Sequence, residues 1–291
     1  MMTYHARLNL IMVTTLIILV TFLYLRPQSQ PHEEYSVSPG TMRSAQNIRI
    51  VRQEKEIVLK HLDSGWHIIK PVYALADESK ILEIMNILSA TSRQRFPLAD
   101  LERFSLERPN IQLYIDNEYF GFGGFAPTAN QQYLATGEYV YLISPRHAIT
   151  LPLEASDILN PMLLAPNETP VKFELTDLTI AFQNGKWDSV TQNAEQLPKE
   201  DVIKRWIQLW QTTYAKKLTL KQAFGEDFTE IGHIKISLQN GQEISFKVLQ
   251  NETEVVILRI NEGISYHISI DAGRQLLDPN AIPSNQIMSG N

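Results

Sequence analysis

The chain has 291 residues, with 26 Lys and Arg against 32 Asp and Glu, so its formal net charge is -6. A hydrophobic content of 44% is that of a globular protein and excludes wholesale disorder. The acidic balance disfavours nucleic acid as a partner, because such proteins need a basic surface. Cysteine is absent, which excludes disulfides, thiolate metal sites and cysteine nucleophiles.

An apolar segment lies close to the amino terminus. Residues 8–25, LNLIMVTTLIILVTFLYL, carry no charge and are bounded by Arg7 and Arg26. As a helix this segment matches the hydrocarbon thickness of a bilayer, about 30 Å. A cleaved signal peptide is the alternative, but its cleavage site needs small residues, and Arg26 and Pro27 follow here. The sequence predicts an uncleaved single-pass anchor over residues 1–26 in a bacterial inner membrane, with the bulk of the chain in the periplasm.

Two segments lack apolar periodicity. Residues 27–46 are rich in Pro, Ser and Gln, and this composition predicts a flexible linker. Residues 278–291, DPNAIPSNQIMSGN, are predicted to form a disordered tail.

The residues between these segments alternate in a way that predicts strands interrupted by helices. The first half contains predicted strands at residues 48–52, 56–62, 66–69, 111–115, 119–125, 131–135 and 139–143, with a helix that begins at the N-cap Asp77. The second half repeats this order with strands at residues 171–175, 178–182, 233–238, 242–248, 254–260 and 264–270 and a helix over residues 198–210.

The two halves align at a steady offset of 121 to 123 residues. The matched pairs are Trp66 and Trp187, Ile84 and Trp206, Leu88 and Trp210, Ile111 and Ile234, and Leu113 and Ile236. We therefore predict an α+β fold in which a single transmembrane helix is followed by two tandem repeats of a mainly antiparallel sheet with one packed helix each. The first repeat covers residues 47–160 and the second covers residues 161–277.

The first repeat resembles DUF4340, a bacterial family known only as a domain of unknown function. The resemblance covers about residues 48 to 151. The similarity lies in IRIVRQEKEIVLKHLDSGWHIIKPVYALADESKILEIMNIL, in RFSLERPNIQLYI and in FGFGGFAPTANQQYLATGEYVYLI. Phe104 and Ser105 stand where Tyr-Gly is common in the family. The resemblance implies an envelope-facing, often membrane-anchored protein, sometimes linked with transporter or gliding systems, and it implies no catalytic residues.

Motifs that suggest chemistry are few. The GFGG run at residues 121–124 is followed by a strand and not by a helix, so we interpret its glycines as permitting a bulge or a close strand crossing. His61 and His67 lie on either side of a turn that contains Asp63, but a third metal ligand is missing. The carboxylates Glu226 and Asp227 are expected to face water. We therefore predict no catalytic, cofactor or metal site.

Large rings on the second helix form the one predicted candidate for a partner surface. Trp206 and Trp210 stand where the first helix has Ile84 and Leu88, and they either fill the core or dock against another protein. The predicted function is that of a non-enzymatic membrane protein that presents its tandem module to an envelope protein. The alternative is a small-ligand-binding accessory module of a transporter, with its ligand in a cleft between the repeats.

Overall fold

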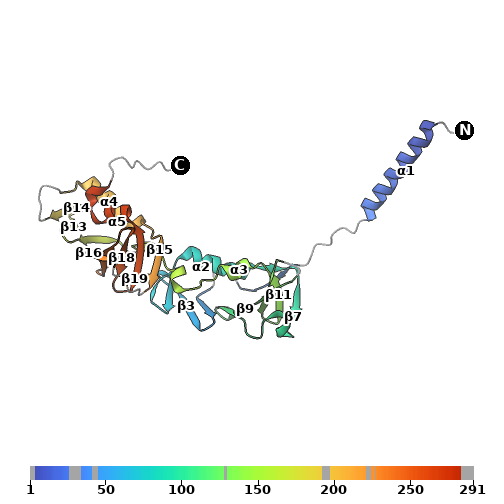
Figure 1. Ribbon diagram of the computed structural model, residues 1–291, viewed down its shortest axis with the longest axis horizontal. Helices are drawn as coiled ribbons and strands as arrows, with labels where there is room; N and C mark the ends of the chain where they lie inside the picture. The colour runs from blue at the N-terminus through green and yellow to red at the C-terminus, as the bar shows by residue number, and fades with distance from the viewer. Residues whose placement is uncertain are drawn as a thin grey trace.

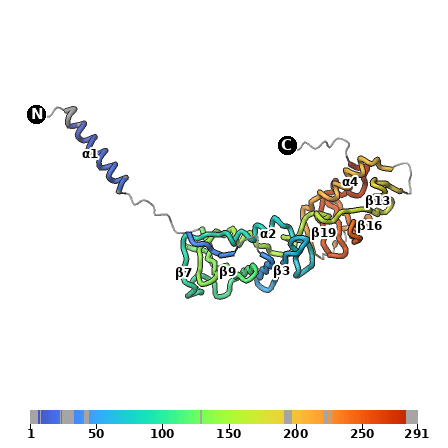
Figure 2. The backbone as a smooth tube through the Cα atoms, turned by 180° about the vertical axis from the view of Figure 1, so that it is seen from behind, coloured from blue at the N-terminus to red at the C-terminus, as the bar shows by residue number. Residues whose placement is uncertain are grey.

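The computed structural model describes residues 4–25, 34–40, 45–127, 130–191, 197–220, 224–225 and 227–282. The fold is α+β, as predicted, and is built mainly from two antiparallel sheets that lie next to one another (Figures 1 and 2). The main sheet of the first half consists of β2 (Asn47–Arg52), β3 (Lys55–Leu62), β4 (Gly65–Lys70), β5 (Ala74–Leu75), β7 (Arg95–Pro97), β8 (Ile111–Ile115), β9 (Glu118–Phe125), β10 (Gln132–Thr136) and β11 (Tyr139–Ile143).

The sheet of the second half is formed by eight strands. These are β12 (Pro170–Glu174), β13 (Leu178–Gln183), β14 (Lys186–Thr191), β15 (Lys217–Leu220), β16 (Thr229–Leu238), β17 (Glu243–Gln250), β18 (Glu254–Arg259) and β19 (Ile264–Ser269). The helices of the two halves are α2 (Glu78–Met85), α3 (Arg146–Ile149), α4 (Glu200–Thr212) and α5 (Ile270–Leu277), and short 3-10 turns include η3 (Leu101–Phe104) and η4 (Ala155–Ile158).

The two sheets have the same strand order. The first runs β4-β3-β2-β8-β9-β10-β11-β7, with β5 added beside β4, and the second runs β14-β13-β12-β16-β17-β18-β19-β15. One helix follows the opening meander of each half, α2 after β2–β5 and α4 after β12–β14, and another follows its closing strand, α3 after β11 and α5 after β19. The described residues of each repeat therefore contain two α-helices and not the single one predicted. The chain therefore contains the same unit twice.

Strand register agrees with the sequence offset. Ile50 lies opposite Ile57 and Leu113 in the first sheet. Phe173 lies opposite Ile180 and Ile236 in the second, and each of these three residues stands 123 positions after its counterpart. Residues at equivalent register positions therefore support the equivalence drawn from the pattern alone.

The first predicted helix begins where its cap residue indicated. The Asp77 side chain accepts the backbone N–H of Ser79 at 2.9 Å, which satisfies a donor that the first helical turn leaves free. Ile81, Ile84 and Met85 are buried on one face of α2, and the chain continues as a 3-10 turn that buries Ile87 and Leu88. These residues join one continuous core that also includes residues of the second sheet.

The glycine run on β9 serves close packing, as interpreted from the sequence. A Cβ on Gly123 would stand 2.4 Å from the carbonyl oxygen of Phe104, and one on Gly121 would stand 2.5 Å from the Tyr119 hydroxyl. The missing side chains therefore let η3 pass directly over the strand, and the pairing of β9 with β10 shifts register nearby.

The amino-terminal segment forms a helix, α1 (Tyr4–Leu25). Its large apolar side chains from Leu10 to Phe22 are all more than half exposed. In the described part of the chain, the predicted transmembrane helix over residues 8–25 is not found, because no helix there meets the length and apolarity needed to cross a bilayer.

The predicted linker and tail are partly wrong where the structure describes them. Within residues 27–46, β1 (Tyr35–Ser36) pairs with β6 (Thr91–Ser92), and Val37 is buried and donates its N–H to Ala90 at 3.0 Å. Two buried apolar side chains, Val37 and Ala45, and a short ladder therefore attach this segment to the first repeat. In the predicted tail, residues 279–281 form a 3-10 turn capped by Asp278, and residues 283–291 lie outside the described part of the chain.

Candidate functional site

The segment that connects the two repeats is hydrogen-bonded to both of them. Asn160 donates its N–H to Leu75 at 3.0 Å in the first repeat. Two residues later the chain bridges to Tyr214 through Met162, and Ala215 donates its N–H to Pro161 at 2.9 Å. The connection is thus part of both structures, and the repeats meet along it.

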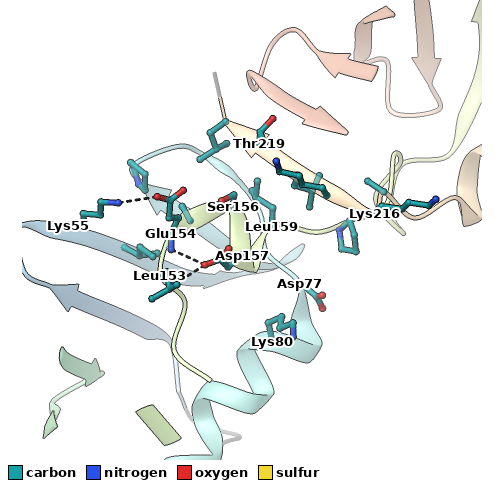
Figure 3. Close-up of a pocket in the computed structure, with 18 of the residues that line it drawn as sticks. Lys55, Asp77, Lys80, Leu153, Glu154, Ser156, Asp157, Leu159, Lys216 and Thr219 are labelled. Atoms are coloured by element: carbon teal, nitrogen blue, oxygen red, sulfur yellow. Dashed lines mark hydrogen bonds and ion pairs between the residues drawn. The ribbon is translucent and has the colours of Figure 1, made fainter. Parts of the chain in front are cut away.

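A cavity with a volume of about 960 Å³ opens at this junction. One wall comes from the first repeat, from β3, the start of α2 and η4. The other wall comes from residues 215–220, which include the edge strand β15 (Figure 3). We call it the junction cleft. It lies between the two copies, where the sequence analysis placed a ligand cleft as an alternative.

The acidic groups of the junction cleft already have partners. Lys55 Nζ donates to Glu154 Oε1 at 3.1 Å (Figure 3). The Asp157 side chain accepts the backbone N–H groups of Leu153 and Glu154 at 2.9 and 3.0 Å. The hydrogen bond from Lys70, at 2.6 Å, lowers the pKa of Glu56. Each of these carboxylates is therefore already held by an ion pair or by hydrogen bonds within the protein.

Two lysines of the opposite wall lack such balance. Lys216 and Lys217 line the junction cleft and are exposed. Neither has an acidic partner within ion-pair distance among the residues that the structure describes. The wall from the second repeat is therefore positive, and across the cleft Asp77 and Asp157 of the first repeat accept hydrogen bonds only from N–H and hydroxyl groups among the described residues.

A chain of hydrogen bonds holds β15 in place. The Thr219 hydroxyl lies 3.0 Å from Nε2 of His267, whose Nδ1 lies 3.1 Å from Oε1 of Glu254. A hydroxyl beside an imidazole that a carboxylate orients is also the arrangement that activates nucleophiles in enzymes. Its direct effect here is to fasten the edge strand β15 to β19 and β18. Spacing in the sequence gave no signal for it, because three separate strands supply its members.

A second cavity at the junction, with a volume of about 400 Å³, is lined mainly by polar side chains, and we call it the polar pocket. The first repeat contributes Ser64, His67 and Tyr73, the connecting segment contributes Asn160 and Asn167, and the second repeat contributes Asn240, Gln242, Arg259, Glu262 and Tyr266. Of this set, the sequence analysis considered His67 alone, and as a possible metal ligand.

Arg259 lies at the centre of the charged cluster in the polar pocket. Its Nη1 donates to Glu168 at 3.1 Å and its Nη2 to the other Glu168 oxygen at 2.5 Å. Its Nε lies 2.9 Å from Oε1 of Glu262. The Arg259 side chain is 11% exposed, so both carboxylates face it with little intervening water. Charge-assisted bonds of this forked kind are both strong and directional.

Burial changes the proton affinity of this cluster. It raises the pKa of Glu262 above the usual 4.5, and the nearby Arg259 opposes that shift only in part. The Tyr266 hydroxyl is also buried, and its pKa is raised. Burial acts to lower the pKa of Arg259, but the bond with Glu168 and the charge of Glu262 outweigh it, so that pKa is raised.

The raised pKa of Glu262 predicts a pH-dependent stability. Between the unfolded pKa, near 4.5, and the higher folded pKa, the folded protein holds a proton that the unfolded chain has lost. Stability is therefore present below this window and falls as pH rises through it, by at most about 1.4 kcal/mol per pH unit. Glu262→Gln is expected to flatten that slope in denaturant unfolding measured from pH 4 to pH 8. The exposed Glu252→Gln is the matched control, and an unchanged slope in Glu262→Gln would contradict the assignment.

The structure corrects the predicted partner surface. Trp206 and Trp210 are fully buried, and both indole N–H groups donate to the Leu276 carbonyl oxygen, at 3.0 and 3.2 Å. Phe173 packs edge-on against Trp206 at 4.7 Å between ring centroids. These rings fill the space under α4 and α5, so no partner can reach them in this conformation.

The other residues considered from the sequence do not assemble into a site. His61 packs against Trp66 at 5.3 Å, and His67 places Nδ1 3.0 Å from the Gly65 carbonyl oxygen, so the two imidazoles have different partners. In the described residues no group of three or more potential metal ligands occurs. Glu226 lies outside the described residues, while Asp227 accepts a hydrogen bond from Asn251 at 3.1 Å.

Comparison of the chain with protein-family models, curated proteins and solved structures gives no match, so the resemblance to DUF4340 stays a prediction.

Proposed function

We propose that the protein is an interaction module held at a membrane by α1, and that an acidic segment of an envelope protein docks in the junction cleft. The observation that carries this proposal is the cleft itself, whose two walls come from different repeats and whose second wall exposes Lys216 and Lys217. A partner bound there contacts both copies at once, which gives the duplication a use.

Membrane attachment is supported by the surface of α1. All residues from Leu10 to Val13 and from Leu16 to Val20 are apolar, and consecutive residues of a helix point to different sides of it. A helix that is apolar all round is stable only when it is buried, and no described part of either sheet covers it. We propose that contact with a bilayer, without spanning it, supplies that burial, and that the two sheets lie on the periplasmic side of a bacterial inner membrane.

The acidic nature of the partner follows from the charges in the cleft. Its own carboxylates are engaged by Lys55, by Lys70 and by backbone N–H groups. An incoming carboxylate therefore meets the two lysines of the opposite wall. Such contacts steer association and weaken with salt.

Site-specific crosslinking in membranes tests this proposal. A photoreactive residue at Leu153, which lines the cleft and is 62% exposed, is expected to give a crosslinked envelope protein whose attached peptide, mapped by mass spectrometry, is acidic. The same residue at Phe125, which is 65% exposed on β9 and does not line the cleft, is the matched control.

Charge reversal completes the test. Lys216→Glu combined with Lys217→Glu is expected to abolish the adduct from position 153 while the protein stays in the carbonate-washed membrane pellet. A basic crosslinked peptide, equal adducts from positions 153 and 125, or an adduct that survives the reversal would refute docking in the cleft. Release of the unmodified protein by carbonate would refute attachment through α1.

A further inference from the structure

We infer that the polar pocket is a binding site for an uncharged saccharide, separate from the junction cleft. The pocket lies where the first hairpin of one repeat, the connecting segment and the second sheet converge. Its lining combines amide side chains, a charged cluster closed upon itself and an exposed aromatic ring. Each of these three features narrows the class of ligand.

The charged cluster argues against an ionic ligand. All three nitrogens of the Arg259 guanidinium have a carboxylate partner, because Nη1 and Nη2 donate to Glu168 and Nε faces Glu262. Arg259 is the one lysine or arginine among the described residues that line the pocket. No cation is therefore left for a phosphate or carboxylate, and both carboxylates already face Arg259, which leaves little attraction for a cationic ligand.

The remaining polar groups offer donors and acceptors together. The side-chain oxygen Oδ1 of Asn160 accepts the backbone N–H of Met162 at 2.9 Å, and the side-chain oxygen Oε1 of Gln242 accepts from the Asn240 side-chain amide at 3.0 Å. The side-chain NH₂ groups of Asn160 and Gln242 therefore remain as donors toward a ligand. His67 Nδ1 lies 3.0 Å from the Gly65 carbonyl oxygen, and its Nε2 lies 3.5 Å from the hydroxyl of Ser64, which also lines the pocket. Hydroxyl groups both donate and accept, and a ligand that carries several of them can satisfy this mixed set.

An aromatic ring stands at the same site. Tyr73 stacks on His67 with ring centroids 5.4 Å apart and an interplanar angle of 28°, and it remains 60% exposed. One face of the phenol is thus supported by the imidazole while the rest is open. The C–H face of a sugar ring packs on such a surface because it is apolar and weakly positive, whereas the ring face is negative.

A neighbouring cavity extends the site. It has a volume of about 450 Å³ and shares Ser64, Leu75, Asn160, Met162 and Asn167 with the polar pocket. Trp66 and Tyr214 line it, and Tyr214 is 63% exposed. A second aromatic surface next to the first favours an oligosaccharide over a single sugar.

Binding of the full-length protein to an array of defined oligosaccharides tests the inference, with the protein kept in a detergent that has no sugar headgroup. The array carries neutral glucose, mannose and N-acetylhexosamine oligomers beside sialylated, phosphorylated and amino sugars. We expect binding to a neutral series, at least about tenfold weaker in Tyr73→Ala and in Gln242→Ala. Phe125→Ala and Gln183→Ala, which replace exposed residues outside the pocket, are expected to bind as the unmodified protein does.

The outcomes separate the source of the sugar and the two sites. Free oligomer that competes in solution indicates a soluble saccharide, and binding only to polymeric glycan indicates a surface chain. Absence of binding to every neutral series, a preference for charged sugars, or equal binding by Tyr73→Ala and Phe125→Ala would overturn the inference. Crosslinking from Leu153 reports on the junction cleft independently, so either site can fail alone.

Discussion

Trp206→Ala is expected to lower the free energy of unfolding by about 3–5 kcal/mol. The indole is fully buried against Phe173 and Trp210, so its removal leaves a cavity that the two helices above it can close only in part. Urea unfolding of the purified chain, followed by circular dichroism, measures the change. The same size of loss is expected for Trp210→Ala.

Two further variants separate packing from hydrogen bonding. Trp206→Phe keeps most of the apolar contact, and the Leu276 carbonyl still accepts from Trp210, so its cost is expected to be near 1 kcal/mol. Trp187→Ala, at a partly buried ring, is the control for loss of an indole and is expected to cost less than Trp206→Ala. Wild-type stability in Trp206→Ala would contradict the role of this ring in the core.

Breaking the Arg259–Glu168 pair is expected to be as damaging. Glu168→Ala leaves the guanidinium, 11% exposed, without its forked partner, and such a loss typically costs about 3–5 kcal/mol. Glu168 also accepts the Ala165 N–H at 2.7 Å, so the connecting segment loses a second contact. A double-mutant cycle with Arg259→Met and Glu168→Leu, measured by urea unfolding, gives the coupling energy.

The double replacement is expected to recover most of the stability, because it leaves no buried charge of the pair unbalanced. Lys204→Ala removes an exposed pair with Glu200 on α4 and is the control for loss of an ion pair at the surface, with no measurable change expected. Additive effects of Arg259→Met and Glu168→Leu would show that the pair carries no coupling.

The sequence predicted most strands because their period of two was intact. Ile111–Ile115 and Tyr139–Ile143 lie at the predicted positions, and the pairing of Trp66 with Trp187 places both rings just after the turns of equivalent hairpins. Such features depend on local alternation and on turn residues, which a single sequence displays.

The misses have identifiable physical causes. Helix α5 follows β19 without a break, so its first residues looked like a continuation of the strand, and Gly273 lowered the helix signal. Gly273 is there because a Cβ would approach Val255 to 2.5 Å. Because α5 was not predicted, the sequence offered no helix to pack over Trp206 and Trp210. Their size was therefore interpreted as a possible partner surface. The helix that occupies the equivalent place in the first repeat, α3, has only four residues.

The polar pocket was beyond reach for a different reason. Glu168 and Arg259 are 91 residues apart, and His67 and Gln242 belong to different repeats. Only the way the two copies meet brings these residues together. Neither periodicity nor motif spacing predicts how the two repeats pack against each other.

Two hydrogen bonds, from Asn160 to Leu75 of the first repeat and from Ala215 of the second repeat to Pro161, hold the connecting segment to both repeats. They restrict rotation of one copy against the other. Cavities formed between two freely hinged bodies must be assembled at each encounter, and the ordering entropy is subtracted from affinity. Here the walls are preorganised, so a ligand enters a shape that already exists, and association rates should depend on diffusion and charge and not on domain closure.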